Sequence, residues 1–211
     1  MPRTNIIRTN EFPYHVTSRA NNHDWFNLHM DDAWRIALRA LKYAYEKYPV
    51  KVHAFVLMNN HYHLLLTTPN SDIDLFMQAF NKRFSDYLKI ETKYVNRMFG
   101  GPYKWTLVKD NLYLYNVYRY LYQNPVRARL CLSCEDYKYS TLQCYTQGAY
   151  FPIKIISCLS EDHEELLEWF NEVRDLREIE AIKRALKKAH FQISKHRDTK
   201  YEAKLNYPKA S

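Results

Sequence analysis

The chain has 211 residues, of which 46% are hydrophobic and 26% are charged, and its formal net charge at pH 7 is +8. It has no apolar run long enough to span a membrane and no hydrophobic amino-terminal signal segment, which predicts a cytoplasmic protein without a membrane partner. The positive charge and the 19 tyrosines favour a nucleic acid with exposed bases, such as a single strand. A basic protein with a tyrosine-rich core is the alternative.

The first predicted element is a strand over residues 11–19, and a helix follows it. Asp31 or Asp32 can cap this helix, and Pro49 ends it. The apolar residues that recur at helical spacing between these limits are Trp34, Leu38, Leu41, Tyr45 and Tyr48.

Residues 51–58 and 61–68 are predicted to form a hairpin of two strands. Asn59 and Asn60 join them, and asparagine tolerates the positive φ that a tight turn requires. The second strand opens with a pair of histidines two residues apart.

The pair is His61 and His63. Alternate residues of a strand point to the same face, so both imidazoles are expected on one face, and Tyr62, Leu64 and Leu66 on the other. Two adjacent neutral imidazoles can begin a divalent-metal site. Two half-exposed strand residues without a ligand are the alternative.

A second helix is predicted to begin at a capping box of Ser71 and Asp74. A strand over residues 103–108 follows it. The helix has an apolar stripe that consists of Phe76, Phe80, Phe84 and Leu88.

A third helix is predicted from the cap at Asp110 to Asn124, with Pro125 ending it. Three apolar residues are expected to anchor it to the sheet, namely Leu114, Val117 and Leu121. Tyr120 and Asn124 lie one turn apart and share a face. Beside the two histidines, they would supply a nucleophile and a third metal ligand, a combination suited to cleaving a phosphodiester. Alternatively, the tyrosines of this helix only pack.

From about Ser160 the pattern changes to a charged helix whose predicted stripe comprises Leu166, Leu167, Phe170, Val173 and Leu176. Its end is strongly basic between Arg184 and Lys200. The helix and tail, about residues 160–211, are expected to help hold or position DNA, so removing residues 194–211 should weaken binding and flatten its dependence on salt. A solvated helix that only covers the sheet is the alternative.

The four cysteines are expected to be reduced thiols. Cys131 and Cys134 form a Cys-x-x-Cys pair, but Cys144 and Cys158 are widely spaced, and no histidine lies at a zinc-finger interval.

The order of elements predicts an α+β fold with a mainly antiparallel sheet, helices packed on it, and a C-terminal helical extension. We expect a domain over residues 1–150 and a basic extension over 151–211. No internal repeat is present.

The sequence resembles the single-tyrosine transposases of the HUH-endonuclease group, in particular the REP-associated tyrosine transposases. Three motifs carry the resemblance: YHVTSRANN at 14–22, MNNHYHL at 58–64 and RYLYQNPVRA at 119–128. They occur in the order and spacing of the family, and the similarity extends from Phe12 to Thr141. Ala20 and Arg129 stand where the family usually has glycine.

This resemblance implies a ferredoxin-like sheet and a metal-dependent enzyme that cleaves and transfers single-stranded DNA. His61 and His63 match the histidine pair, Tyr120 the nucleophile that becomes a 5′-phosphotyrosine, and Asn124 the residue that completes the coordination of Mg²⁺ or Mn²⁺. The implied substrate is single-stranded or hairpin DNA, and the implied location is the bacterial cytosol, at the nucleoid.

Five basic residues are candidates for phosphate contacts, and each could instead be a solvated charge: Arg19, Lys82, Arg83, Arg127 and Arg129. Two other functions stay open. One is a replication initiator or relaxase with the same histidine pair, and the other is a non-catalytic DNA- or RNA-binding protein with the same fold. The oligomeric state can be a monomer or a homodimer.

Overall fold

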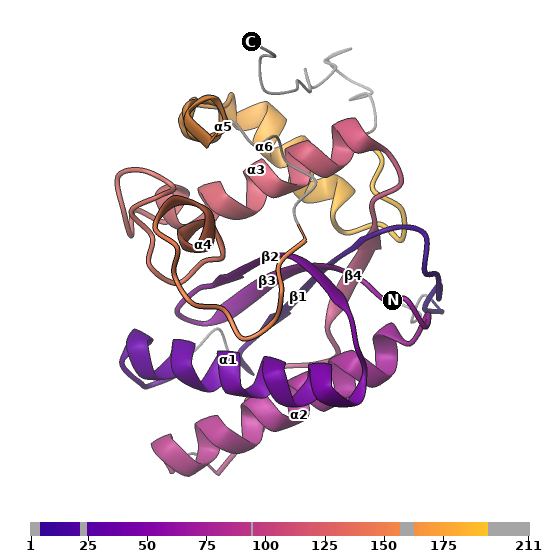
Figure 1. Cartoon of the computed structure of the whole chain (residues 1–211), viewed down its shortest axis with the longest axis vertical. Helices are drawn as coiled ribbons and strands as arrows, with labels where there is room; N and C mark the ends of the chain where they lie inside the picture. Colours follow the sequence, from indigo (N-terminus) through magenta and orange to yellow (C-terminus); the bar gives the residue numbers. More distant parts are fainter. Residues whose placement is uncertain (1–4, 22–24, 94, 157–162, 194–211) are drawn as a thin grey trace.

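Four antiparallel strands form the centre of the structure, a computed structural model that describes residues 5–21, 25–93, 95–156 and 163–193 (Figure 1). The strand order is β2-β3-β1-β4, and all three pairs of neighbours are antiparallel. The strands are β1 (Tyr14–Arg19), β2 (Lys51–Leu57), β3 (His61–Thr67) and β4 (Lys104–Leu107). The predicted α+β fold with an antiparallel sheet is confirmed.

Helices cover both faces of the sheet. On one face lie α1 (Met30–Lys47) and α2 (Ile73–Thr92), and on the other lies α3 (Asn111–Arg127) (Figure 1). Three shorter helices follow along the chain: α4 (Leu142–Thr146), α5 (His163–Asn171) and α6 (Leu176–Ala185).

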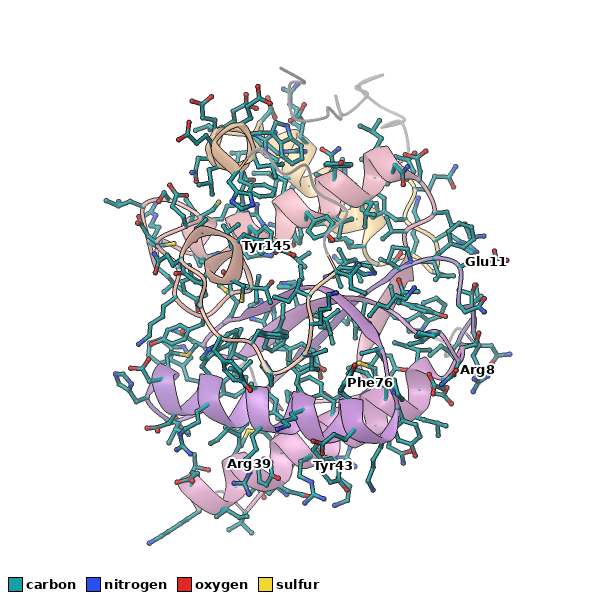
Figure 2. All side chains as sticks on the ribbon, in the orientation of Figure 1. Arg8, Glu11, Arg39, Tyr43, Phe76 and Tyr145 are labelled. Carbon is teal, nitrogen blue, oxygen red and sulfur yellow. The ribbon has the colours of Figure 1, made fainter. Side chains whose placement is uncertain are left out.

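The core beneath α1 and α2 follows the strand alternation that the sequence predicts. Tyr62, Leu64 and Leu66 point into this core and are fully buried, whereas Leu65 belongs to the core on the α3 side. The predicted α2 stripe is confirmed, because all four of its residues are fully buried (Figure 2 labels Phe76). The residues in question are Phe76, Phe80, Phe84 and Leu88.

The predicted helix caps need correction. His29, and not Asp31 or Asp32, caps α1, and its Nδ1 accepts from the Asp31 amide at 3.3 Å. At α2 the N-cap is Asp72, and Ser71 precedes it with φ at +55°, so the capping box does not form. Of the predicted α1 stripe, Leu41 is fully buried and the other four residues are partly buried against the core. The most buried side of α1 consists mainly of small residues, which let the helix approach α2. It consists of Ala33, Ile36, Ala37, Ala40, Leu41 and Ala44.

On the opposite face, the predicted α3 anchors are confirmed and form a second core with α5 and α6. Two helices, α5 and α6, stand where the sequence predicts a single charged helix. Leu166 and Phe170 are buried, but Val173 and Leu176 are 98% and 78% exposed. They lie at the break between α5 and α6, where the helical periodicity that would align them with Phe170 is lost. The basic residues from 194 onward lie outside the described residues.

Both edges of the sheet are hydrogen-bonded to other parts of the same chain. Along β2, the amide of Leu57 donates to Tyr139 and the amide of Ile156 donates to Val52. At β4, Leu107 donates to Ala189 and accepts from Phe191. Such coverage removes backbone groups that could otherwise pair with a further strand.

Candidate active site

The two predicted histidines lie side by side at the start of β3, on the sheet face that α3 covers. Their ring centroids are 5.1 Å apart and their planes are nearly perpendicular. His63 is 6% exposed, and His61 is partly exposed. The placement of both imidazoles on one face is as the sequence predicts.

Tyr120 approaches this pair from α3. Its ring lies edge-on to that of His63, with 6.0 Å between the centroids, and the residue is 8% exposed. Tyr118 and Tyr122 lie on another side of α3, and both are buried. The ring centroids of Tyr122 and Phe170 are 5.2 Å apart. Of these three tyrosines, Tyr120 is the one whose ring contacts the histidine pair.

His15, whose place in the sequence did not mark it as a site residue, also lies here. It lies on β1, is 2% exposed, and its Nε2 is 2.9 Å from Nδ1 of His63. The two rings stack with centroids 5.2 Å apart. Burial lowers the pKa of His15 to about 3 and the pKa of His63 well below its ordinary value, so both rings are neutral at pH 7.

A second polar contact holds His61. Its Nδ1 is 2.7 Å from Oδ1 of Asn60, the residue that closes the turn before β3. Since an amide oxygen only accepts, Nδ1 of His61 carries the proton. The nitrogen of His61 that can bind a cation is therefore Nε2.

Asn124 and Arg127 surround Tyr120 at the C-terminal end of α3. The Asn124 amide donates to the Tyr120 carbonyl at 3.1 Å, and its oxygen accepts from Arg127 at 3.0 Å. The Arg127 guanidinium lies 4.5 Å from the centre of the Tyr120 ring. Burial raises the pKa of the Tyr120 hydroxyl, and the charge of Arg127 acts against this increase. Arg127 therefore favours the ionised form of Tyr120.

The C-terminus of α3 differs from the prediction, because Pro125 lies within the helix, which continues to Arg127. A proline in the last turn costs the helix one backbone hydrogen bond. Only Val126 and Arg127 follow it within the helix, so little helical structure lies beyond the lost bond. The helix closes with a Schellman motif, in which Leu130 donates to the Pro125 carbonyl and Arg129 to the Val126 carbonyl. Arg129 has φ at +57°, the left-handed conformation that glycine adopts most easily.

Replacing Arg129 with glycine should raise the free energy of unfolding by about 1 kcal/mol, because glycine adopts this conformation without steric cost. Urea denaturation would measure the change. Arg129→Ala is the matched control, since it removes the charge but keeps the strained conformation, and should give no such gain. A loss of stability in Arg129→Gly would contradict the prediction.

The other three basic candidates lie in two places. Arg19 ends β1 directly across from His61, at the site. Lys82 and Arg83 are on α2, behind the opposite face of the sheet, and the structure does not bring them to the histidines. Arg83 stacks on Tyr43 at 3.9 Å, on the side of α1 that points away from the sheet (Figure 2).

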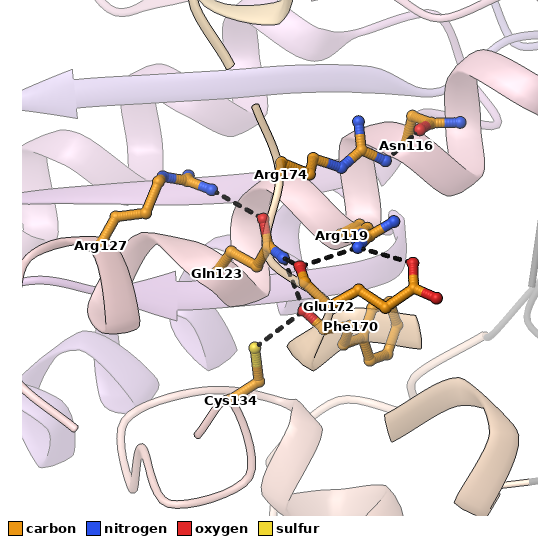
Figure 3. A network of polar contacts seen from close by, with 8 residues as sticks. All are labelled: Asn116, Arg119, Gln123, Arg127, Cys134, Phe170, Glu172 and Arg174. Atoms are coloured by element: carbon orange, nitrogen blue, oxygen red, sulfur yellow. Dashed lines mark hydrogen bonds and ion pairs between the residues drawn. The ribbon is translucent and has the colours of Figure 1, made fainter. Parts of the chain in front are cut away.

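A polar network joins α3 to the C-terminal helices (Figure 3). Arg119 donates to the Glu172 carbonyl at 2.8 Å and to its carboxylate at 3.1 Å. Gln123 donates to the Phe170 carbonyl at 2.7 Å and accepts from Arg127 at 3.1 Å. The C-terminal helices thus help to fix the end of α3 that carries Tyr120.

Acidic side chains and cysteine thiolates are the other common metal ligands. Within the described ranges, no group of three or more His, Cys, Asp or Glu side chains is arranged to hold a metal ion. Cys131, Cys134 and Cys144 are free thiols, as predicted, and Cys158 lies outside the described residues. Burial raises the pKa of Cys131 to about 11. A cation beside Tyr120 would therefore need His61, His63 and the amide oxygen of Asn124 as its ligands.

The chain thus combines an antiparallel sheet, a histidine pair on an inner strand and a tyrosine on the helix that covers this face. A family model described as "Transposase IS200 like" matches residues 9–123, more than half of the chain. The protein belongs to this family. No curated protein sequence matches it significantly.

Several solved structures are similar to the chain, and two of them are transposases. A REP-associated tyrosine transposase bound to a REP hairpin is 15% identical, with a TM-score of 0.59, over 77% of this chain and 96% of that one. The likeness shows a common fold. A putative transposase from Deinococcus radiodurans is 14% identical, with a TM-score of 0.39, over 62% of this chain and 91% of that one. Among the described residues, no helix is long and apolar enough to cross a membrane.

Proposed function

We propose that this transposase is a metal-dependent endonuclease and strand transferase that acts on single-stranded DNA through Tyr120. The observation that carries the proposal is the contact between Tyr120 and His63, whose ring centroids are 6.0 Å apart. His61 lies beside them, so a tyrosine oxygen and two imidazoles can act on one phosphate. Membership in the IS200-like family supports DNA as the substrate.

In the proposed reaction, Tyr120 Oη forms a bond to phosphorus while the bond between phosphorus and the 3′-oxygen breaks. The phenolic proton is lost to solvent, and the departing 3′-oxygen gains a proton. The products are a 5′-phosphotyrosine and a free 3′-OH. Attack by another 3′-OH on the phosphotyrosine reverses the step and joins the strands. Arg127, which lies against the Tyr120 ring, supports the negative phenolate and then the attached phosphate.

The residues at the site fit a divalent cation. Nδ1 of both histidines is engaged, by Asn60 and by His15, so each ring would bind the ion through Nε2. Asn124 would be the third ligand, because its amide oxygen has a second lone pair besides the one that Arg127 uses. A bound cation would polarise the phosphate and stabilise charge on the leaving oxygen. Of Mg²⁺ and Mn²⁺, two imidazole nitrogens favour Mn²⁺.

We propose single-stranded or hairpin DNA as the partner. The similar transposase structure contains a REP hairpin, and in this chain Arg19, Arg127 and Arg129 lie around the site or at the end of α3. Lys82 and Arg83 would contact DNA only if it extends to the α2 side of the sheet. We also propose that residues 1–150 form the catalytic domain and 151–211 the extension.

The test is a covalent adduct. The purified protein is incubated with a labelled hairpin that has a single-stranded flank and with Mn²⁺, and the products are separated under denaturing conditions. A labelled protein band together with a released 3′-OH fragment is expected. Tight binding of the hairpins without any adduct would instead favour the non-catalytic DNA-binding alternative.

Replacing Asn124 with alanine should lower cleavage by about tenfold at limiting Mn²⁺, because the third ligand is lost. Water can occupy a vacated position around the ion, so activity should recover at high Mn²⁺. A titration of cleavage rate against Mn²⁺ measures both effects. Wild-type activity at every Mn²⁺ concentration would show that Asn124 is not a ligand.

A further inference from the structure

His15 forms a ring-to-ring hydrogen bond with one of the two histidines proposed to bind the cation. The two residues come from different strands, β1 and β3, and point to the face that α3 covers. Their nitrogens are 2.9 Å apart, and the residues are 2% and 6% exposed. At this burial no water competes readily for the contact, so the hydrogen bond limits where the ring protons can lie.

A hydrogen bond between two imidazole nitrogens needs one N–H group and one lone pair. Two neutral arrangements satisfy it. In the first, Nδ1–H of His63 donates to Nε2 of His15, and Nε2 of His63 keeps its lone pair. In the second, Nε2–H of His15 donates to Nδ1 of His63, whose Nε2 then carries a proton and cannot bind a cation.

We propose that His15 is the acceptor, and that it is a positioning residue which holds His63 in the tautomer whose Nε2 can bind a divalent cation. Its fixed ring also restrains the orientation of His63 on the sheet. This inference rests on the proposed metal-dependent function. The proposal gives β1 a role in the site through His15, in addition to the two predicted metal ligands on β3.

The contact made by His61 supports this assignment. Its Nδ1 donates to the amide oxygen of Asn60, which leaves Nε2 as the metal-binding nitrogen. With His15 as acceptor, both histidines of the pair have the same tautomer, each fixed by a neighbour from outside the ligand set. Outer partners of this kind orient metal-binding histidines and raise the basicity of the ligand nitrogen.

The first experiment determines the tautomer directly in the full-length, metal-free protein. Long-range ¹H–¹⁵N correlation spectra of ¹⁵N-histidine-labelled protein distinguish a protonated Nδ1 from a protonated Nε2, and His63→Gln assigns the signals of His63. We expect His63 to carry its proton on Nδ1 and to lack it on Nε2. The opposite tautomer would overturn the proposal. This result depends on neither activity nor metal.

The second experiment measures the affinity for Mn²⁺ alone, by the electron paramagnetic resonance signal of the free ion. His15→Leu removes the acceptor and should lower the affinity by about 10- to 100-fold, the range found for outer partners of metal ligands. His15→Gln places an amide oxygen near the former Nε2 and should restore most of it. Circular dichroism and thermal unfolding check that both variants are folded.

The outcomes separate this inference from the proposed function. If His61→Ala and His63→Ala weaken Mn²⁺ binding but folded His15→Leu does not, the positioning role is wrong and the metal site stands. An equal loss in His15→Gln and His15→Leu would also refute the role of His15 as an acceptor. If none of the four variants changes Mn²⁺ affinity, the proposed metal site itself fails, and the inference fails with it.

Discussion

Replacing Tyr120 with phenylalanine should eliminate the covalent protein–DNA species and lower cleavage by at least about a thousand-fold, as loss of a catalytic nucleophile does. The change removes only the attacking oxygen. The ring remains, so the contacts with His63 and Arg127, the fold and the affinity for DNA should be preserved. Denaturing gels with labelled DNA measure the adduct, and mass spectrometry of the trapped wild-type adduct identifies its residue.

Tyr122→Phe is the matched control, because Tyr122 lies on the same helix but is buried in the core against Phe170. It loses a hydrogen bond of 3.2 Å to Thr141, so it should be slightly less stable but should still form the adduct. A nucleotide attached to Tyr113, Tyr118 or Tyr122 would overturn the assignment of Tyr120. An adduct in Tyr120→Phe would do so as well.

Replacing either His61 or His63 with alanine should lower cleavage by about a hundred-fold or more, because a bound cation contributes several kcal/mol to stabilising the transition state. Excess chelator should have the same effect on the wild-type protein. DNA affinity should change little, since contacts between basic side chains and phosphates supply most of it. Cleavage assays and filter binding at a fixed salt concentration measure the two quantities separately.

His190→Ala is a suitable control, because His190 is exposed and its known contact is a backbone bridge to Leu107. This variant should cleave at the wild-type rate and should respond to chelator as the wild type does. Full cleavage by the wild type in excess chelator would refute metal dependence. Full cleavage by His63→Ala would remove this residue from the site.

The sequence predicted most of the elements because their signals are local. Strand alternation placed His61 and His63 on one face of β3, and helical spacing placed Tyr120 apart from Tyr118 and Tyr122. Asp110 caps α3 as predicted and accepts from the Tyr113 amide at 3.1 Å. Each of these features depends on residues within a few positions of one another.

The errors occurred where packing or chain geometry overrides a local preference. Pro125 was expected to end α3, but the helix continues to Arg127 and is closed by Arg129 and Leu130, which donate to the Val126 and Pro125 carbonyls. Val173 was assigned to an apolar stripe, and the break between α5 and α6 leaves it exposed instead. Local periodicity does not show where a helix will be interrupted.

The sequence by itself determined the fold class, the antiparallel hairpin with its histidine pair, and the helix that carries Tyr120 and Asn124. Only the tertiary structure decided which other groups reach them. His15 and His63 are 48 positions apart, and they meet because β3 pairs with β1 and not only with its hairpin partner β2. The packing of α3 on one face of the sheet brings Tyr120 to His63. The packing of α2 on the other face separates Lys82 and Arg83 from the site. Contacts between distant segments depend on how the strands and helices pack, and no spacing along the chain encodes this arrangement.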